Sequence, residues 1–441
     1  MSAVLRILAL AIILRLVAAS QTVDTLYGTA SHPAKPVIAA IAITGNSVTR
    51  PAIILREMTL HVGDTLDQDE LDYCRKRIYS LGLFNRVDII ATPEDSVTLV
   101  IDVDERWYLY PVPLLGIVDR DFNKWFYGIG VTHQNFRGWN EKVFVGFVLG
   151  YNPWASVSYS NPWIFGDEQM FSTTGFGYNK IQNKSILSKG GGPNFDEVHY
   201  SAFETIGKRF DQFHSAWLSL GYKSVQVTDN RSGRTISPSG RDRFPSVAVG
   251  AKMDTRNLAE YPTKGLFGYA EIGKKGFFFG DVDFVSYALD LRTYIKLYGY
   301  PTLALRAFTK LSSGPGIPNY AHEYFGFSER IRGHFDEEME GEELAGFSVE
   351  LRIPLFPEFY LHVPAMQFPE FSTWRLGVYS ALFFDAGTTW YKHERPDLLN
   401  APRGYGAGLH VLLPYSFVLR VDRAFSETRR GEWVFDLGAS F

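Results

Sequence analysis

Residues 285–297 read VSYALDLRTYIKL, a run in which apolar and polar side chains alternate. The apolar set is Val285, Tyr287, Leu289, Leu291, Ile295 and Leu297, and the polar set is Ser286, Asp290, Arg292 and Lys296. Successive side chains of a β-strand point to opposite faces, so this period of two predicts a strand with one apolar and one polar face. Such a strand can meet lipid on one side and water on the other.

The same alternation recurs from about residue 108 to the last residue, between turns rich in Gly and Asn. It is found at residues 143–149, 157–161, 347–353, 376–384, 415–421 and 433–441. A soluble sandwich also alternates, so the period alone does not separate the two architectures. Backbone groups in lipid must all be paired internally, which requires a closed sheet. Strands of about ten residues allow about 16 strands in residues 108–441, which predicts a mainly β protein with a 16-stranded antiparallel transmembrane β-barrel.

Composition and the start of the chain narrow the class of protein. The 441 residues carry a net charge of −4 with no dense basic run, which argues against nucleic-acid binding. Cys74 is the single cysteine, which excludes an internal disulfide and a multi-cysteine metal site. Arg6 precedes an apolar run that ends in the small residues 18–20. Residues 1–20 are therefore predicted to be a secretory signal peptide rather than a membrane anchor, with residues 21–35 as a linker.

A smaller unit of different character is expected at residues 36–106. A short β-branched strand ends at the turn residues Gly45 and Asn46. A helical stretch follows, for which Thr49 is the expected N-cap.

A second helix of this unit is expected to open at Asp67, with Glu70 as the partner in a variant capping box. Gly82 is the expected C′ residue of this helix. Two strands follow, at about residues 87–91 and 97–103. The predicted order of the unit is therefore β-α-α-β-β.

This unit resembles a POTRA domain, the periplasmic polypeptide-binding repeat that precedes certain outer-membrane barrels. The resemblance rests on Gly45 and Asn46 and above all on the turn Leu81-Gly82-Leu83-Phe84. It implies an edge strand that accepts an extended client strand, and unpaired backbone groups on such an edge permit this. A rigid spacer is the alternative. No second copy is present in the sequence, so a single POTRA domain is predicted.

Four further stretches resemble the BamA/TamA superfamily, also known as the bacterial surface antigen family, whose members join POTRA domains to a barrel. The first is Asn135-Phe136-Arg137-Gly138, which resembles the turn after the first barrel strand, and the second is Ser160-Asn161-Pro162-Trp163, which resembles the close of a following hairpin. The third resembles a mid-barrel signature and contains Asp254, Arg256, Pro262 and Gly265. The fourth is the pair Ile331-Arg332-Gly333 and Phe383-x-Asp385-x-Gly387. Phe441, preceded by Trp433 and Phe435, is similar to the signal by which outer-membrane proteins are recognised for assembly. The resemblance implies an outer-membrane location with the POTRA domain in the periplasm.

The last pair of stretches implies a lock between a loop and the barrel wall, formed by Ile331, Arg332, Gly333, Phe383, Asp385 and Gly387. The strand alternation supports the pairing independently, because it puts Phe383 and Asp385 on the face opposite Leu382 and Phe384. A carboxylate beside a ring can bind a guanidinium by pairing and by stacking.

The alternative interpretation has Arg332 as an exposed loop arginine and Asp385 as one of several lumenal charges, such as Glu350, Arg352, Arg420 and Asp422. His334 departs from the family pattern, which has an aromatic residue at that position.

No catalytic residue, metal site or cofactor is expected, because the sequence has neither a nucleophile elbow nor a zinc-binding helix. Two functions remain open: an assembly factor that inserts β-barrel proteins through its POTRA domain and a lateral barrel seam, or a polypeptide secretion pore of the same fold. An outer-membrane enzyme is a third class without a recognisable nucleophile. The expected partners are unfolded outer-membrane or secreted polypeptides and the lipid bilayer, with periplasmic or lipoprotein accessory subunits as further candidates. Residues 355–374 are too long for a tight turn, and an interfacial position is one interpretation of their aromatic content.

Overall fold

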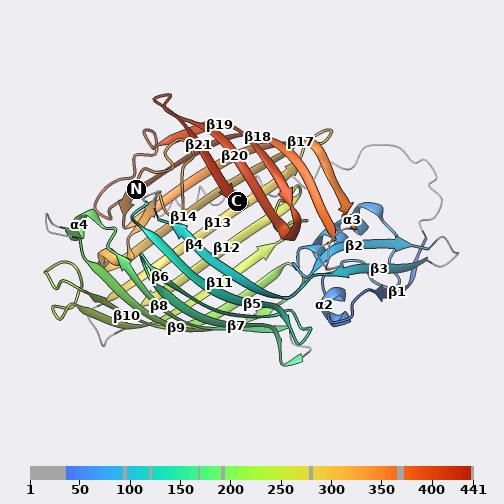
Figure 1. Cartoon of the computed structure of the whole chain (residues 1–441), viewed down its shortest axis with the longest axis horizontal. Helices are drawn as coiled ribbons and strands as arrows, with labels where there is room; N and C mark the ends of the chain where they lie inside the picture. The colour runs from blue at the N-terminus through green and yellow to red at the C-terminus, as the bar shows by residue number, and fades with distance from the viewer. Residues whose placement is uncertain are drawn as a thin grey trace, which may run out of the picture.

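A small α/β unit lies at one end of a large curved sheet (Figure 1). The computed structural model describes residues 36–92, 97–118, 122–166, 169–189, 194–277, 282–364 and 372–438. The predicted signal peptide, the linker and Phe441 lie outside these residues. Within them, no helix combines the length and the apolar character that crossing a bilayer requires.

The small unit has the predicted order β-α-α-β-β. Its elements are β1 (Ile38–Thr44), α2 (Pro51–Leu55), α3 (Gln68–Tyr79), β2 (Phe84–Ala91) and β3 (Val97–Glu105). Strand β3 is central, parallel to β1 and antiparallel to β2. The two helices bury their apolar residues against this mixed sheet, and Cys74 is a fully buried member of that core.

Helix α3 starts as predicted and ends slightly differently. The Asp67 side chain accepts hydrogen bonds from two backbone amides of the first turn, one of them that of Glu70 at 3.3 Å. The Glu70 side chain accepts a hydrogen bond from the Thr59 hydroxyl, which joins the helix to the segment before it. Ser80 is the C-cap, so Leu81 occupies the C′ position and the predicted C′ residue Gly82, with φ +74°, lies one position further on.

Helix α2 does not use Thr49 as its N-cap. The cap is Arg50, which makes no side-chain capping bond. The Thr49 hydroxyl instead lies 3.0 Å from the Tyr108 hydroxyl and accepts a hydrogen bond from Asn135. Thr49 therefore joins the small unit to the large sheet, a role that local sequence rules do not reveal.

The described residues after the small unit form a sixteen-stranded antiparallel sheet, as predicted. Its strands are β4 (Leu109–Ile117), β5 (Trp125–Phe136), β6 (Glu141–Gly150), β7 (Trp154–Ile164), β8 (Met170–Gln182), β9 (Asp196–Arg209), β10 (His214–Val227), β11 (Arg241–Asp254), β12 (Gly265–Lys275), β13 (Asp283–Lys296), β14 (Thr302–Gly316), β17 (Glu343–His362), β18 (Thr373–Trp390), β19 (Arg403–Leu413), β20 (Phe417–Ser426) and β21 (Gly431–Leu437). Each strand pairs with the next of this series along the chain, which gives a continuous meander. A four-residue helix, α4 (Ile186–Lys189), lies between β8 and β9.

The alternation along the strands separates an apolar outer face from a polar inner face. On β18, Leu382 is 53% exposed and Phe384 39%, whereas Phe383 is 5% exposed and Asp385 4%. The predicted facing of this strand is therefore correct.

Closure of the sheet remains a prediction. In the described part of the chain no backbone pairing joins β4 to β21, and these two strands are the edges of the sheet. The sheet is bent into a curved wall (Figure 1) whose concave face carries the buried charges.

Two predictions about turns in the sheet are wrong: one turn follows a different strand, and the other stretch is not a turn. The turn at residues 135–138 follows β5, the second strand of the sheet, because β4 precedes it. Pro111 and Pro113 interrupt the strand pattern of β4, which is why the alternation did not reveal this strand. Residues 160–163 belong to the end of β7 rather than to a turn. Likewise, residues 355–362 continue β17 and residues 373–374 begin β18, while residues 365–371 lie outside the described chain.

Candidate functional site: a locked loop and two free sheet edges

The segment between β14 and β17, residues 317–342, is called the lid loop here. It contains a short hairpin of β15 (Glu323–Phe325) and β16 (Met339–Gly341). Its tip, residues 326–338, carries the arginine predicted to form the lock.

Arg332 and Asp385 form the predicted contact. Nε of Arg332 lies 2.6 Å from Oδ2 of Asp385, and Nη2 lies 2.9 Å from Oδ1, a bidentate pair. The guanidinium carbon also lies 3.7 Å from the centre of the Phe383 ring. Arg332 and Asp385 are each about 95% buried, at 5% and 4% exposed. The interpretation of Arg332 as an exposed loop residue is therefore wrong.

Two further carboxylates bind the same guanidinium. Nη1 of Arg332 lies 2.8 Å from Glu350 on β17 and 3.3 Å from Asp422 on β20. Burial alone would lower the pKa of Arg332, but these carboxylates and Asp385 raise it well above its usual range. The sequence predicts Glu350 and Asp422 only as lumenal charges, because their convergence on Arg332 depends on strand register.

Glycines make room for the loop. Gly333 has φ +104°, and a Cβ there would lie 2.8 Å from the Phe425 carbonyl oxygen. A Cβ on Gly387 would lie 2.4 Å from the Phe325 ring, and one on Gly404 would lie 1.6 Å from the Arg332 carbonyl oxygen. Gly404 was not predicted as a site residue, although its place in a Gly-x-Gly-x-Gly strand was a signal of crowding.

Apolar and polar contacts hold the rest of the loop tip. Ile331 is 1% exposed and packs with Phe325 and Leu344. The backbone amides of Gly333 and Phe335 both donate to Glu432 Oε1, at 2.7 and 3.1 Å.

His334 binds two carboxylates. Nδ1 lies 2.7 Å from Glu337 in the same loop, and Nε2 lies 2.7 Å from Glu427 in the turn between β20 and β21. Burial alone would lower the pKa of His334, but the two carboxylates raise it. Both ring nitrogens can donate only in the imidazolium form, so a positive His334 fits this position.

The mid-barrel signature connects the lock to the end of the sheet. Arg352 binds Glu350 at 2.8 Å and donates to the Pro262 carbonyl oxygen at 3.1 Å. Asp254 forms a bidentate pair with Arg256 at 2.8 and 2.9 Å. Gly265 has φ +114°, and a Cβ there would lie 2.2 Å from a backbone oxygen, which fixes the return of this loop to β12. These predicted residues thus stabilise the loop between β11 and β12, and none of these contacts involves Arg332.

The turn after β5 fastens the sheet to the small unit. Asn135 is fully buried, donates to Thr49 at 2.9 Å and accepts from the Asn140 amide at 2.8 Å. The Gly138 carbonyl oxygen accepts from the Arg50 amide at 3.0 Å, and a Cβ at Gly138 would lie 2.2 Å from the Val48 oxygen. Both predicted residues therefore belong to the junction between the two units.

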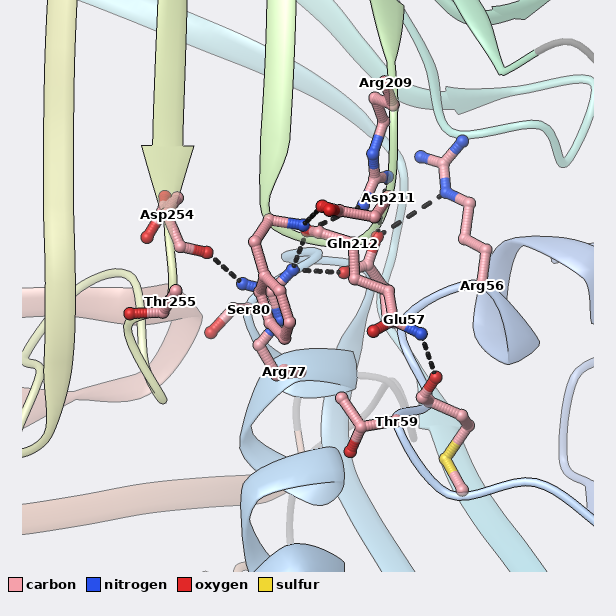
Figure 2. A network of polar contacts seen from close by, with 12 residues as sticks. Arg56, Glu57, Thr59, Arg77, Ser80, Arg209, Asp211, Gln212, Asp254 and Thr255 are labelled. Carbon is pink, nitrogen blue, oxygen red and sulfur yellow. Dashed lines mark hydrogen bonds and ion pairs between the residues drawn. The ribbon is translucent and has the colours of Figure 1, made fainter. Parts of the chain in front are cut away.

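A second junction centres on Glu57 (Figure 2). Its two carboxylate oxygens bind Arg77 and Arg209, each at 2.8 Å. Arg77 also donates to the backbone oxygens of Asp254 and Gln212 at 2.9 and 2.7 Å. Burial alone would raise the pKa of Glu57, but the arginines around it lower this pKa below its usual value. The Glu57 carboxylate is therefore ionised. These bonds join the small unit to the ends of β9 and β11.

The predicted residues of the small unit have structural roles. Gly45 has φ +82°, and a Cβ added at this position would lie 1.9 Å from the Val103 carbonyl oxygen. The Asn46 side chain donates a hydrogen bond to the Thr49 carbonyl oxygen at 3.0 Å. Phe84 is fully buried in the core and Leu81 packs against it, while Gly82 supplies a positive φ.

The free edge of β4 lacks two of its backbone hydrogen-bond donors. The Gln134 amide donates to Tyr108 and the Val118 amide to Lys124, so even-numbered residues face β5 and odd-numbered residues face the free edge. Two of the odd-numbered residues, Pro111 and Pro113, have no N–H.

The free edge of β21 has its full set of donors. The Ser426 amide donates to Arg430 and the Gly438 amide to Val418, so the even-numbered residues of β21 face β20. The amides of Gly431, Trp433, Phe435 and Leu437 therefore point to the free edge. The Trp433 and Phe435 side chains are 54% and 66% exposed on the outer face.

One cavity borders both edges and the lock. Its volume is about 830 Å³, and its lining includes Ile117 of β4, Phe435 of β21, Arg332 and Asp385. The free edges and the locked loop thus form one continuous site.

The chain belongs to the Omp85 superfamily, an outer-membrane class defined by this combination of sheet and periplasmic domain. Residues 135–441 match the family model described as the Omp85 superfamily domain, and residues 36–106 match the POTRA model described as a surface antigen variable number repeat. The small unit is therefore a POTRA domain. The family places the protein in the outer membrane, with the POTRA domain on the periplasmic side.

Individual relatives are distant. The chain is 24% identical over 320 residues to the outer membrane protein assembly factor BamA of Nitratidesulfovibrio vulgaris, a match that covers 68% of this chain and 38% of that protein. The chain thus spans less than two-fifths of that relative. The structure of BamA from Haemophilus ducreyi lacking POTRA domains 1–3 matches with a TM-score of 0.55 at 17% identity, over 92% of this chain and 84% of that one. CdiB from Acinetobacter baumannii matches with a TM-score of 0.51 at 15% identity, over 91% and 73% of the two chains, and CdiB from Escherichia coli with 0.51 at 10%, over 95% and 92%.

Proposed function

We propose that this protein is an outer-membrane assembly factor that inserts β-barrel proteins through a lateral seam between β4 and β21. The observation that carries the proposal is the pair of free sheet edges. An unpaired strand edge offers a row of backbone donors and acceptors to another strand.

In this proposal the sheet closes into a barrel in the membrane, and the seam is its weakest junction. Lipid cannot satisfy backbone groups, so the two edges must pair with each other or with a client strand. The missing donors of Pro111 and Pro113 limit how well β4 can pair with β21. A client strand therefore competes with an incomplete ladder rather than with a full one.

The POTRA domain receives the client first. Strand β1 is partly covered, because Gly63 and Leu66 bond backbone oxygens at its start, whereas the outer edge of β2 has no strand partner among the described residues. An extended polypeptide can add to β2. Periplasmic or lipoprotein subunits are candidate partners for the same domain.

The mechanism is non-enzymatic. The free energy comes from the client, whose strands exchange unpaired backbone groups for a complete ladder in lipid. The lock keeps the lid loop over the cavity while the strands are exchanged.

Depletion combined with crosslinking tests this function. Photoreactive residues at Leu115 of β4 and Phe435 of β21 should trap strands of newly made outer-membrane barrels, and the same residue at Ile90 of β2 should trap them earlier. Depletion should lower the abundance of several outer-membrane barrels together. Unchanged barrel abundance after complete depletion would contradict an assembly role.

A polypeptide secretion pore is the second candidate, favoured by the cavity beneath the lid loop. If the lid loop leaves the concave face, the cavity of about 830 Å³ becomes part of an open passage. A pore predicts that Arg332→Ala increases conductance in planar bilayers and that depletion removes one exported polypeptide from the medium while barrels stay normal.

A further inference from the structure

A second cavity lies where the POTRA domain meets the ends of β9, β10 and β11. Its volume is about 310 Å³, within the range of small-ligand pockets. Its charged lining is unbalanced: the cations are Arg56, Arg77, Arg209, Lys252 and Arg256, and the carboxylates are Glu57 and Asp254. His214 also lines it and is paired with Asp211 at 2.8 Å.

The two carboxylates are already fully used. Glu57 binds Arg77 and Arg209 through its two oxygens, and Asp254 binds Arg256 through both of its own. Lys252 is therefore left without an ion pair among the described residues, and Arg56 has only a longer one, because Arg77 and Arg209 take the closer positions on Glu57. This longer ion pair joins Arg56 Nε to Glu57 at 3.6 Å.

Arg56 has spare donors in a buried place. Its side chain is 8% exposed, and it makes one hydrogen bond, from Nη1 to the Pro162 oxygen at 3.2 Å. Nε of Arg56 and Nε of Arg77 are buried without a hydrogen-bond partner in the described chain. Burial, followed by the charge of Arg209, lowers the pKa of Arg56 to about 10, so the neighbouring Glu57 offsets only part of the cost of this buried cation.

Lys252 supplies a further positive charge on the other side of the cavity. It projects from β11, is exposed, and forms no ion pair or hydrogen bond with the residues that the structure describes. Figure 2 shows Arg56, Arg77 and Arg209 converging on Glu57 from both units. A multiply charged anion in this cavity would neutralise the excess that the protein leaves.

We propose that this cavity binds a phosphate group at the junction of the POTRA domain and the sheet. Arginine donors in a fork geometry match phosphate oxygens, and a phosphate can accept several of them at once. The cavity also has apolar walls, Leu81, Pro162, Phe171 and Phe213, at the strand ends where phospholipid headgroups lie. The phosphate can therefore belong to a headgroup or be free, and both sources share this recognition chemistry.

The test uses the full-length protein in detergent and needs no client, so its outcome is separate from that of the proposed assembly function. Isothermal titration would use inorganic phosphate, a soluble short-chain phosphatidic acid, and an acidic peptide without phosphate. We expect saturable phosphate binding that Lys252→Ala weakens by about tenfold or more, the effect of losing one charged contact. Lys208→Ala is the matched control, because Lys208 is also exposed, precedes Arg209 on β9 and does not line the cavity.

Comparing the affinities for phosphatidic acid and for inorganic phosphate distinguishes a lipid headgroup from a free phosphate ion. Tighter binding of the phosphatidic acid than of inorganic phosphate identifies a lipid headgroup, and equal binding identifies the free ion. Equal affinities in Lys252→Ala and Lys208→Ala, no saturable phosphate binding, or binding of the acidic peptide alone would each overturn the proposal. Arg56→Lys is a second variant that keeps the charge but loses the fork, and it should also weaken binding.

Discussion

Arg332 of the lid loop and Asp385 of β18 form a bidentate ion pair across 53 positions of sequence, with Nε–Oδ2 at 2.6 Å and Nη2–Oδ1 at 2.9 Å. Glu350 and Asp422 share the same guanidinium. The lock is therefore one cation among three carboxylates, and replacing the cation affects all three.

Arg332→Ala should release the lid loop. It leaves three buried carboxylates facing one another, and removal of one partner from a buried pair costs roughly 3–5 kcal/mol. We expect a lower urea midpoint of unfolding. The folded fraction at each urea concentration can be read from gels, on which the folded and unfolded protein migrate differently. Arg332→Lys should recover only part of this loss, since an ammonium cannot form the bidentate pair and stack on Phe383. Arg330→Ala is the control, because Arg330 is more exposed in the same loop; a similar loss in both variants would argue against the lock.

Exchange of the charges, Arg332→Asp with Asp385→Arg, should recover little stability over the single changes. The exchange puts a carboxylate at position 332 beside Glu350 and Asp422, which remain negative. A simple two-residue pair would instead recover most of its stability. Urea unfolding of the two single variants and the double variant gives the coupling free energy that decides between these cases.

The loop tip should be held more tightly in mild acid than in mild base. The pKa of His334 is raised in the folded protein, so its stabilising charge is fully present below the unfolded value of about 6.5 and is lost as pH rises through the higher folded value. Spin labels at Glu338 and Thr428 should report a broader distance distribution at pH about 8.5 than at about 6. The control, His334→Phe, should give the same distribution at both; pH dependence in that variant would assign the effect to another group.

Gly404→Ala should displace the lid loop without changing a charge. A Cβ at this position would lie 1.6 Å from the Arg332 carbonyl oxygen, which is backbone and cannot rotate away. We expect raised conductance in planar bilayers and a stability loss of roughly 1–3 kcal/mol from overpacking. Gly268→Ala is the matched control, because a Cβ there meets only ordinary contacts at 3.7 Å and beyond. Normal conductance in Gly404→Ala would show that the lid loop keeps its position despite the added methyl group, which would contradict this prediction.

Restoring donors to β4 should tighten the seam. Pro111→Thr with Pro113→Thr adds two backbone N–H groups to the free edge, each worth about 1 kcal/mol if it pairs with β21. The variant should resist heat-dependent unfolding better and yield less crosslink between Leu115 and client strands. Val112→Thr is the control, since its amide faces β5 and the edge donors stay the same. More crosslinked client in the double variant would contradict a role of the prolines in weakening the seam.

The sequence predicts those parts of this site that follow from the alternation of apolar and polar residues along a strand. The facing of Phe383 and Asp385 follows from the period of β18, and the POTRA domain follows from its capped helix and its Leu-Gly-x-Phe turn. The lock pair required the family resemblance as well, because nothing local links a loop arginine to a strand that follows much later.

Residues whose role depends on register were missed. Glu350, Asp422 and Glu432 meet the lid loop because β17, β20 and β21 are aligned as they are, and alternation gives the face of a strand but not its alignment with its neighbours. Strand β4 was missed for a different reason. Its two prolines remove the usual strand signal, and an edge position tolerates them.

The partners of Arg332 also set an order of events during folding. They lie on β17, β18 and β20, so the full set of three carboxylates exists only after β20 has joined the sheet. A chain that stalls before this stage leaves the loop arginine with an incomplete set of partners. The lid loop thus gains its full set of ion pairs only when β20 is in place, and the susceptibility of this loop to a protease should distinguish molecules that have reached this stage from those that have not.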